Sequence, residues 1–173
     1  MESDLQNQLL RRIKRLLIVF MVGMFFSGAT AFFLETEVNF LAAWMGIAEN
    51  AKPETLTGAS AWMAKVRDGL HETNLKYPFI AYGTDWLGFA HLVLMVLFIG
   101  PYKDPVKNKW VIHFGLICCL SVFPLAIICG EIRGIPWGWR MIDCSFGFFG
   151  AIPLWWVKRL IEQVERLQKS QTA

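Results

Sequence analysis

The stretch LLIVFMVGMFFSGATAFFL, residues 16–34, decides the fold class of this chain. It contains no ionisable side chain. Because an α-helix rises 1.5 Å per residue, a helix of this length reaches about 28 Å and nearly matches the ~30 Å hydrocarbon core of a bilayer. The stretch therefore predicts a helix that spans a membrane.

Three further apolar stretches follow it along the chain. Residues 86–102 contain only His91 as an interruption, residues 110–130 contain only His113, and residues 135–157 contain Arg140 and Asp143. We predict an all-α integral membrane protein in which the four stretches are transmembrane helices. With 173 residues and a hydrophobic content of 55%, residues 1–173 are expected to form a single four-helix transmembrane domain.

The segments outside these stretches also have helical patterns. In the outer loop, residues 35–85, apolar residues recur at helical spacing on both sides of Pro53, so we predict two short interfacial helices there. Residues 158–173 are predicted to form a cytoplasmic helical extension with an apolar face made of Leu160, Ile161, Val164 and Leu167. A similar face precedes the first stretch. The two extensions could pack on each other, on a lipid surface or on a partner protein, and packing on each other needs the fewest assumptions.

A cleaved signal peptide is the alternative for the first stretch. A basic segment precedes it, and Ala29-Thr30-Ala31 resembles a cleavage site. The apolar run continues past this triplet, however, and is longer than the roughly 7–15 residues of a signal core, which favours a retained helix. Its row of small residues, Gly23, Ser27 and Ala31, predicts a face on which another helix packs closely.

The distribution of Lys and Arg predicts the orientation. Residues 1–15, 103–109 and 158–173 hold 11 of the 17 basic residues but only 5 of the 14 acidic ones. Short cytoplasmic segments retain such a basic excess. Both termini are therefore predicted to face the cytoplasm, in the inner (plasma) membrane of the cell.

The positions of the basic residues and of the cysteines indicate which partners and which thiol chemistry to expect. The net charge of +3 does not indicate nucleic-acid binding, because the basic residues are divided among membrane-flanking segments. We expect the lipid bilayer as the main partner, and a homo-oligomer or another membrane protein as the second. All four cysteines lie in apolar stretches without CxxC spacing and are interpreted as packing residues, while a disulfide between Cys129 and Cys144 stays open.

The fourth stretch contains the main candidates for a site. Only 14 residues separate Asp143 from Lys158, and they reach about 21 Å, so Asp143 must lie inside the outer boundary of the hydrocarbon core. His91 in the second stretch and Ser27 in the first reach a similar depth, and Arg140, on the same helix as Asp143, lies one turn nearer the outer boundary. These residues form the candidate ligand or proton site, because an ionisable group inside a membrane needs a partner.

A purely structural interpretation of this layer is favoured. Arg140 and Asp143 are three residues apart and are expected to neutralise one another, while His91 and Ser27 add hydrogen bonds between helices. The charged residues near the outer helix ends are interpreted first as a solvated rim and second as a vestibule. They are Glu35, Glu37, Asp85, Glu131 and Arg133.

Cofactor chemistry is not indicated by the pattern. His113 lies near the inner boundary, about 16 Å from the depth of His91, so the two cannot ligate one haem. His91 and Asp143 provide too few ligands for a zinc ion. No Ser/His, Asp/Asp or HExxH pattern of a membrane protease occurs at matched depth. We predict no catalytic residue, no metal and no cofactor.

These observations favour a small multi-pass membrane protein that acts as a structural or interaction module and not as an enzyme. The alternative is a small transporter or a proton-linked ligand-binding protein. It would use the layer of Arg140, Asp143 and His91 near the outer face.

Overall fold

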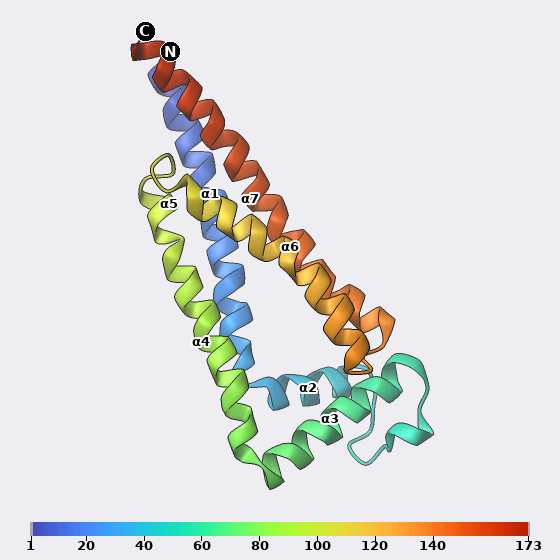
Figure 1. The fold of residues 1–173 in the computed structure, drawn as a ribbon. Coiled ribbons are helices and arrows are strands. Elements are labelled where there is room, and N and C mark those ends of the chain that lie inside the picture. Colours follow the sequence, from blue (N-terminus) through green and yellow to red (C-terminus); the bar gives the residue numbers. More distant parts are fainter. Residues whose placement is uncertain (1, 173) are drawn as a thin grey trace. The chain divides into compact units, whose positions relative to one another are not determined.

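A computed structural model of the protein describes residues 2–172, with side chains described for residues 4–170. Within this range the chain is helical apart from short connections, and no β-strand occurs (Figure 1). The elements are α1 (Glu2–Ala31), α2 (Leu34–Trp44), η1 (Pro53–Thr55), α3 (Gly58–Lys76), η2 (Pro78–Ala81), α4 (Tyr82–Leu97), α5 (Ile99–Lys103), α6 (Lys109–Ile132) and α7 (Trp137–Thr172).

Three segments of the described chain are long and apolar enough to cross a membrane. They are Asp4–Ala31, Pro78–Lys103 and Lys109–Ile132. An all-helical protein with three candidate membrane-spanning segments is thus confirmed. The fourth crossing stays a prediction. The segment of α7 that would cross contains Arg140, Asp143 and Pro153, which lower its mean hydropathy.

Two of the predicted spans end or break where the sequence pattern indicates continuity. α1 ends at Ala31, and Phe32 and Phe33 form the turn into α2, so the first helix stops before the predicted boundary at Leu34. The second span is divided at Phe98 into α4 and α5. Pro101 accounts for this break, because in a continuous helix its ring would clash with the carbonyl four residues earlier.

The structure comprises two compact units. We call residues 2–23 together with 94–172 the terminal unit, and residues 24–93 the central unit. The buried core of the terminal unit includes the apolar faces of both predicted extensions. Its fully buried large side chains are Ile13, Leu17, Phe98, Pro101, Val111, Ile112, Leu154, Val157, Ile161 and Val164.

Within the terminal unit, α6 and α7 pack against each other (Figure 1). A methyl group added at Gly147 would lie 2.5 Å from the carbonyl oxygen of Cys119. At the other end of the pair, Nζ of Lys109 donates a hydrogen bond to Oε2 of Glu165 at 2.7 Å. The two helices therefore approach closely at Gly147 and are tied by a charge pair at the start of α6.

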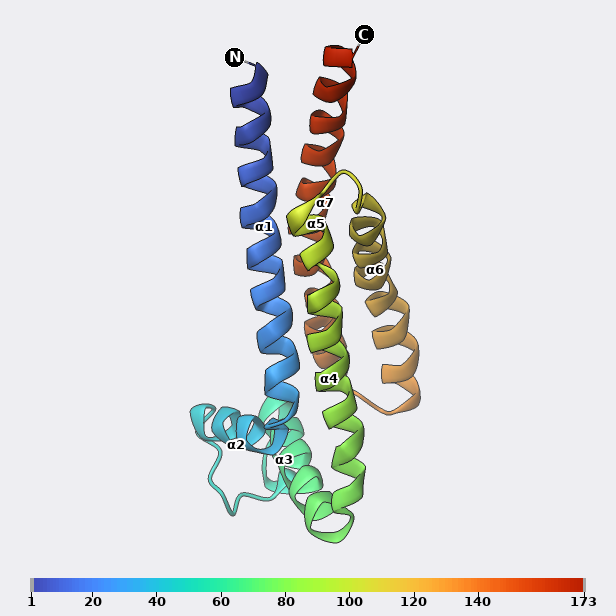
Figure 2. The same cartoon turned by 90° about the vertical axis from the view of Figure 1, so that its left-hand side faces the viewer.

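In the central unit, α2 packs against α3 (Figure 2). A buried arginine fixes the loop that connects the two helices. Arg67 on α3 is only 9% exposed. Its guanidinium donates hydrogen bonds to the carbonyl oxygens of Ala48 and Ala51, both at 2.9 Å, and to the carboxylate of Asp68 at 2.8 Å. Gly46 starts the loop with a φ of 74°, a conformation that glycine adopts without strain.

Also in the central unit, α1 and α4 approach closely at one pair of glycines. A methyl group on Gly28 would lie 2.9 Å from the carbonyl oxygen of Gly88, and one on Gly88 would lie 2.7 Å from that of Gly28. The close-packing face predicted from the row Gly23, Ser27 and Ala31 was therefore wrong. An added methyl at Gly23 meets nothing within 4 Å, and Ser27 is exposed.

Candidate functional site

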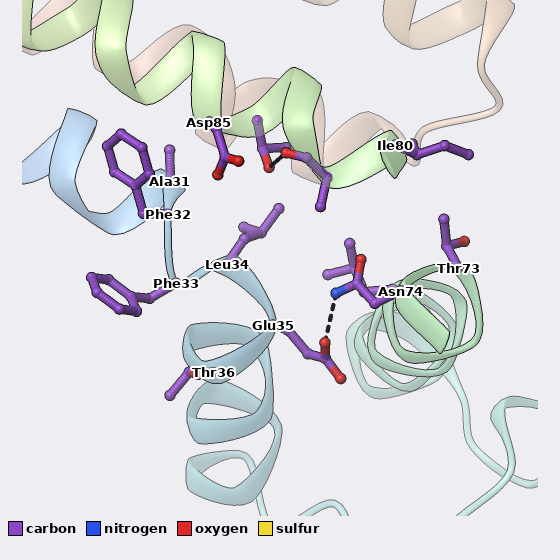
Figure 3. A pocket seen from close by; sticks show the side chains of 13 residues that line it. Ala31, Phe32, Phe33, Leu34, Glu35, Thr36, Thr73, Asn74, Ile80 and Asp85 are labelled. Atoms are coloured by element: carbon purple, nitrogen blue, oxygen red, sulfur yellow. Dashed lines mark hydrogen bonds between the residues drawn. The ribbon is translucent and has the colours of Figure 1, made fainter. Parts of the chain in front are cut away.

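A cleft of about 300 Å³ opens in the central unit where four helices come together at their ends (Figure 3). The sharp turn between α1 and α2 forms one wall, the last turns of α3 form the second, and η2 with the start of α4 forms the third. Its lining residues are Ala31, Phe32, Phe33, Leu34, Glu35, Thr36, Leu70, Thr73, Asn74, Ile80, Ala81, Thr84 and Asp85.

Glu35, in the first turn of α2, is held by two side chains of α3. Nδ2 of Asn74 donates a hydrogen bond to its Oε2 at 2.6 Å, and Nδ1 of His71 donates one to its Oε1 at 2.8 Å. These bonds, that of Asn74 first, hold the pKa of Glu35 below its ordinary value of 4.5, because they favour the ionised carboxylate. Glu35 is thus an anion that joins α2 to α3.

Asp85 reaches the same cleft from the first turn of α4 (Figure 3). Its carboxylate has no hydrogen bond or ion pair with any residue that the structure describes. A negative charge in the first turn of a helix is favourable because the free N–H groups there carry partial positive charge. Two predicted vestibule residues, Glu35 and Asp85, therefore share one cleft, whereas Glu37 is exposed and does not line it.

In the terminal unit, Arg140 lies in the first turn of α7, directly after the connection from α6. Its side chain is buried. Nε donates a hydrogen bond to the carbonyl oxygen of Ile135 at 2.7 Å, and Nη1 pairs with the carboxylate of Glu131. The guanidinium also lies 5.9 Å from the ring centroid of Trp137. The predicted pairing of Arg140 with Asp143 was wrong, because a partner across the turn takes its place.

Asp143 lies one turn further along α7 and is half-buried. It makes no hydrogen bond or ion pair with any residue in the described part of the chain. Arg133, another predicted vestibule residue, is exposed in the α6–α7 turn, and Glu131 is exposed beside Arg140. The predicted rim on this side thus consists of one ion pair and one solvent-exposed cation.

His91 and Ser27, the other two residues of the predicted layer, lie in the central unit. Nδ1 of His91 donates a hydrogen bond to the carbonyl oxygen of Leu87 at 2.9 Å, within α4. Ser27 is exposed, and its backbone carbonyl accepts a hydrogen bond from Thr30 at 3.3 Å. The layer stays a prediction, because Arg140 and Asp143 belong to one unit and His91 and Ser27 to the other.

The chemistry available in the cleft is limited to hydrogen bonding and charge. Glu35 and Asp85 offer acceptor oxygens beside an apolar wall that includes Phe32 and Ile80. A nucleophile activated by a neighbouring base does not occur among the residues that line it. Over the part of the chain with described side chains, no group of three or more His, Cys, Asp or Glu residues is arranged to hold a metal ion. All four cysteines, Cys129 and Cys144 included, are free thiols.

Three polar residues of α3 were missed at the level of sequence. Arg67 fixes a loop, and His71 and Asn74 hold Glu35. Their spacing of three to four residues places them on one face of a helix, which is the signal that was available. Apart from Asp68, which follows Arg67 directly, their partners lie between 16 and 39 residues away along the chain, so no local pattern identifies those pairs.

No family model, no curated protein and no solved structure matches this chain.

Proposed function

We propose that this protein crosses the inner (plasma) membrane four times and acts there as a structural or interaction module. The observation that carries the proposal is the amount of large apolar surface left exposed on the long helices. On α6, Ile117, Leu120 and Leu125 are each more than 60% exposed, and on α7 Phe146 and Phe149 are 68% and 65% exposed. Such side chains require lipid or another apolar surface around them.

The geometry of α7 supports a fourth crossing. Residues 137–157 reach about 32 Å as a helix, enough for the ~30 Å hydrocarbon core if Arg140 lies near its outer edge. At the other end, Nζ of Lys158 and the guanidinium of Arg159 lie 5.3 and 5.0 Å from the ring centroid of Trp155. Aromatic and basic side chains of this kind anchor a helix at the membrane boundary.

The hydrogen bonds of the two buried arginines support a structural or interaction role more than an enzymatic one. Arg67 binds two loop carbonyls, and Arg140 binds a carbonyl and Glu131. Both buried cations are therefore engaged in holding turns together. The α6–α7 pair and the α2–α3 pair each form a preformed helical surface that a neighbouring membrane protein or a second copy can contact.

Two measurements test the membrane part of the proposal. Reporter fusions at the C-terminal end and within residues 51–69 are expected to report opposite sides of the membrane, with the C-terminal end in the cytoplasm. The protein is also expected to remain in the membrane fraction after alkaline extraction. Fusions that report the same side would refute the fourth crossing. Release of the protein by alkali would refute integration into the membrane.

The module part is tested by what copurifies with the full-length protein after mild detergent extraction. We expect a stoichiometric protein partner or a defined oligomer by size-exclusion chromatography with light scattering. A monomer without a partner, combined with a bound small molecule, would favour the alternative of a ligand-binding protein or transporter.

One observation favours that alternative at a single residue. Asp143 is half-buried in an apolar helix and has no partner among the described residues. An acid in that position inside a membrane is expensive and is often functional. Arg140 no longer belongs to the proposed layer, because Ile135 and Glu131 occupy its guanidinium. A proton-linked function would therefore depend on Asp143 without Arg140 as its fixed counter-charge.

A further inference from the structure

Three arginines form one stripe on the first helix of the terminal unit. Gln8, Arg11, Arg12 and Arg15 are spaced at i, i+3, i+4 and i+7, so their side chains share one face of α1. A hollow of about 230 Å³ lies among these four side chains. The three arginines are exposed and have no ion pair with any residue that the structure describes. No acidic residue occurs between residues 5 and 34, so none lies within helical reach of them.

The stripe points away from the protein core. Leu9, Ile13 and Leu17, which are buried in the terminal unit, lie on the opposite face of α1. Lys14, which lies between the two faces, is 5.5 Å from the ring centroid of Tyr102. The arginine stripe is thus a charged surface that the terminal unit itself does not cover.

The position of the stripe along α1 matches the level of lipid headgroups. The uninterrupted apolar run begins at Leu16, directly after Arg15. If the run enters the hydrocarbon core on the cytoplasmic side, the stripe extends about 10 Å outward from that boundary. This is the zone in which clustered basic side chains meet the phosphates of anionic lipids.

The choice of arginine goes beyond what orientation requires. Of the other two basic segments, residues 103–109 contain lysines and no arginine and residues 158–173 contain two lysines and two arginines, and lysine serves the positive-inside rule equally well. A guanidinium differs because its planar fork donates two parallel hydrogen bonds to a phosphate, whereas an ammonium acts as a point charge. Three such forks around one hollow suit a ligand with several phosphate oxygens.

We propose that Gln8, Arg11, Arg12 and Arg15 form a binding site for the phosphate of an anionic lipid headgroup. The guanidinium groups donate to the phosphate oxygens, and the amide of Gln8 closes the outer end of the hollow. The inference rests on the proposed membrane insertion with a cytoplasmic N-terminus.

The test uses the purified full-length protein in detergent micelles and measures lipid binding by native mass spectrometry. Phosphatidylglycerol and phosphatidylcholine are titrated separately, and inorganic phosphate is added as a competitor. We expect tight binding of phosphatidylglycerol alone. The triple variant Arg11→Lys, Arg12→Lys, Arg15→Lys is expected to bind it about tenfold more weakly, because it keeps the charge but loses the paired hydrogen bonds.

The matched control is the double variant Lys103→Arg, Lys107→Arg, which changes basic residues of the same predicted side and is expected to bind like the wild type. Circular dichroism checks that all variants keep their helix content. Equal phosphatidylglycerol affinity of the triple variant would overturn the site, because charge alone would then explain the binding. Full displacement by inorganic phosphate would overturn the lipid as the source of the phosphate.

Alkaline extraction of native membranes tests insertion separately from this site. A protein that resists extraction but does not distinguish the two lipids overturns the lipid site only. A protein that is released by alkali overturns the proposed membrane function.

Discussion

Replacing Gly147 with alanine tests the close packing of α6 on α7. The new methyl group would lie 2.5 Å from the carbonyl oxygen of Cys119 and 3.2 Å from Cβ of Val122. Because the first neighbour is backbone, it cannot rotate away, and the helices must separate by at least about half an ångström. A gap of 0.5–1 Å removes roughly a quarter to a half of the attraction between facing atoms. We therefore expect Gly147→Ala to lower the free energy of unfolding by about 1–3 kcal/mol.

The assay is reversible unfolding of the purified protein in mixed detergent micelles, followed by far-ultraviolet circular dichroism. Gly138→Ala is the matched control, because Gly138 lies in the same helix and a methyl there meets nothing within 4 Å. This control is expected to be neutral or stabilising, since alanine favours helix more than glycine by up to about 1 kcal/mol. A Gly147→Ala protein as stable as the Gly138→Ala protein would refute the packing argument.

Four further substitutions are tested by unfolding. Arg140→Gln is expected to lower the free energy of unfolding by about 1–3 kcal/mol, because it leaves the Ile135 carbonyl and the Glu131 carboxylate without their donor. Asp143→Asn is expected to leave the free energy of unfolding unchanged. Equal losses in the two variants would indicate that the two side chains depend on each other. Ile161→Ala removes a fully buried side chain and is expected to lower the free energy of unfolding by about 2–5 kcal/mol, so a neutral result would contradict the packing of the C-terminal part of α7. The lowered pKa of Glu35 adds stability that is present above its ordinary value of 4.5 and is lost as the pH falls through the lower folded value. Thermal unfolding from about pH 6 to about pH 3 should therefore show less acid sensitivity in Glu35→Gln than in the wild type, and equal sensitivity would contradict the ionised Glu35.

The helical fold and the apolar segments could be predicted because they depend on local periodicity and length. Residues 16–34 and 110–130 contain no charged residue, so hydrophobicity alone identifies them. The helix ends were less predictable. The end of α1 at Ala31 depends on how Phe32, Phe33 and Leu34 turn into α2, and an apolar run carries no signal for such a turn.

The candidate site residues were predictable only as individual residues. The partner of Arg140 could not be deduced, because Asp143 at i+3 is the closest acid on the helix, while Glu131 becomes adjacent only once Gly134, at a φ of 66°, reverses the chain. The cleft has the same origin. Glu35 and Asp85 line the same cleft although 50 residues separate them along the chain. The hydrogen bonds of His71 and Asn74 to Glu35 fix α2 against α3, and no sequence motif indicates them.

The burial of Arg67 has a consequence for proteolysis. Trypsin cleaves after arginine only where the backbone can be drawn into its active site, and Arg67 lies within α3 with its side chain engaged by Ala48 and Ala51. Cleavage at Arg67 therefore requires the α2–α3 connection to open, so its rate in detergent solution reports the local opening of the central unit. The exposed Arg133, in the turn between α6 and α7, needs no such opening and provides the internal reference for the same digest.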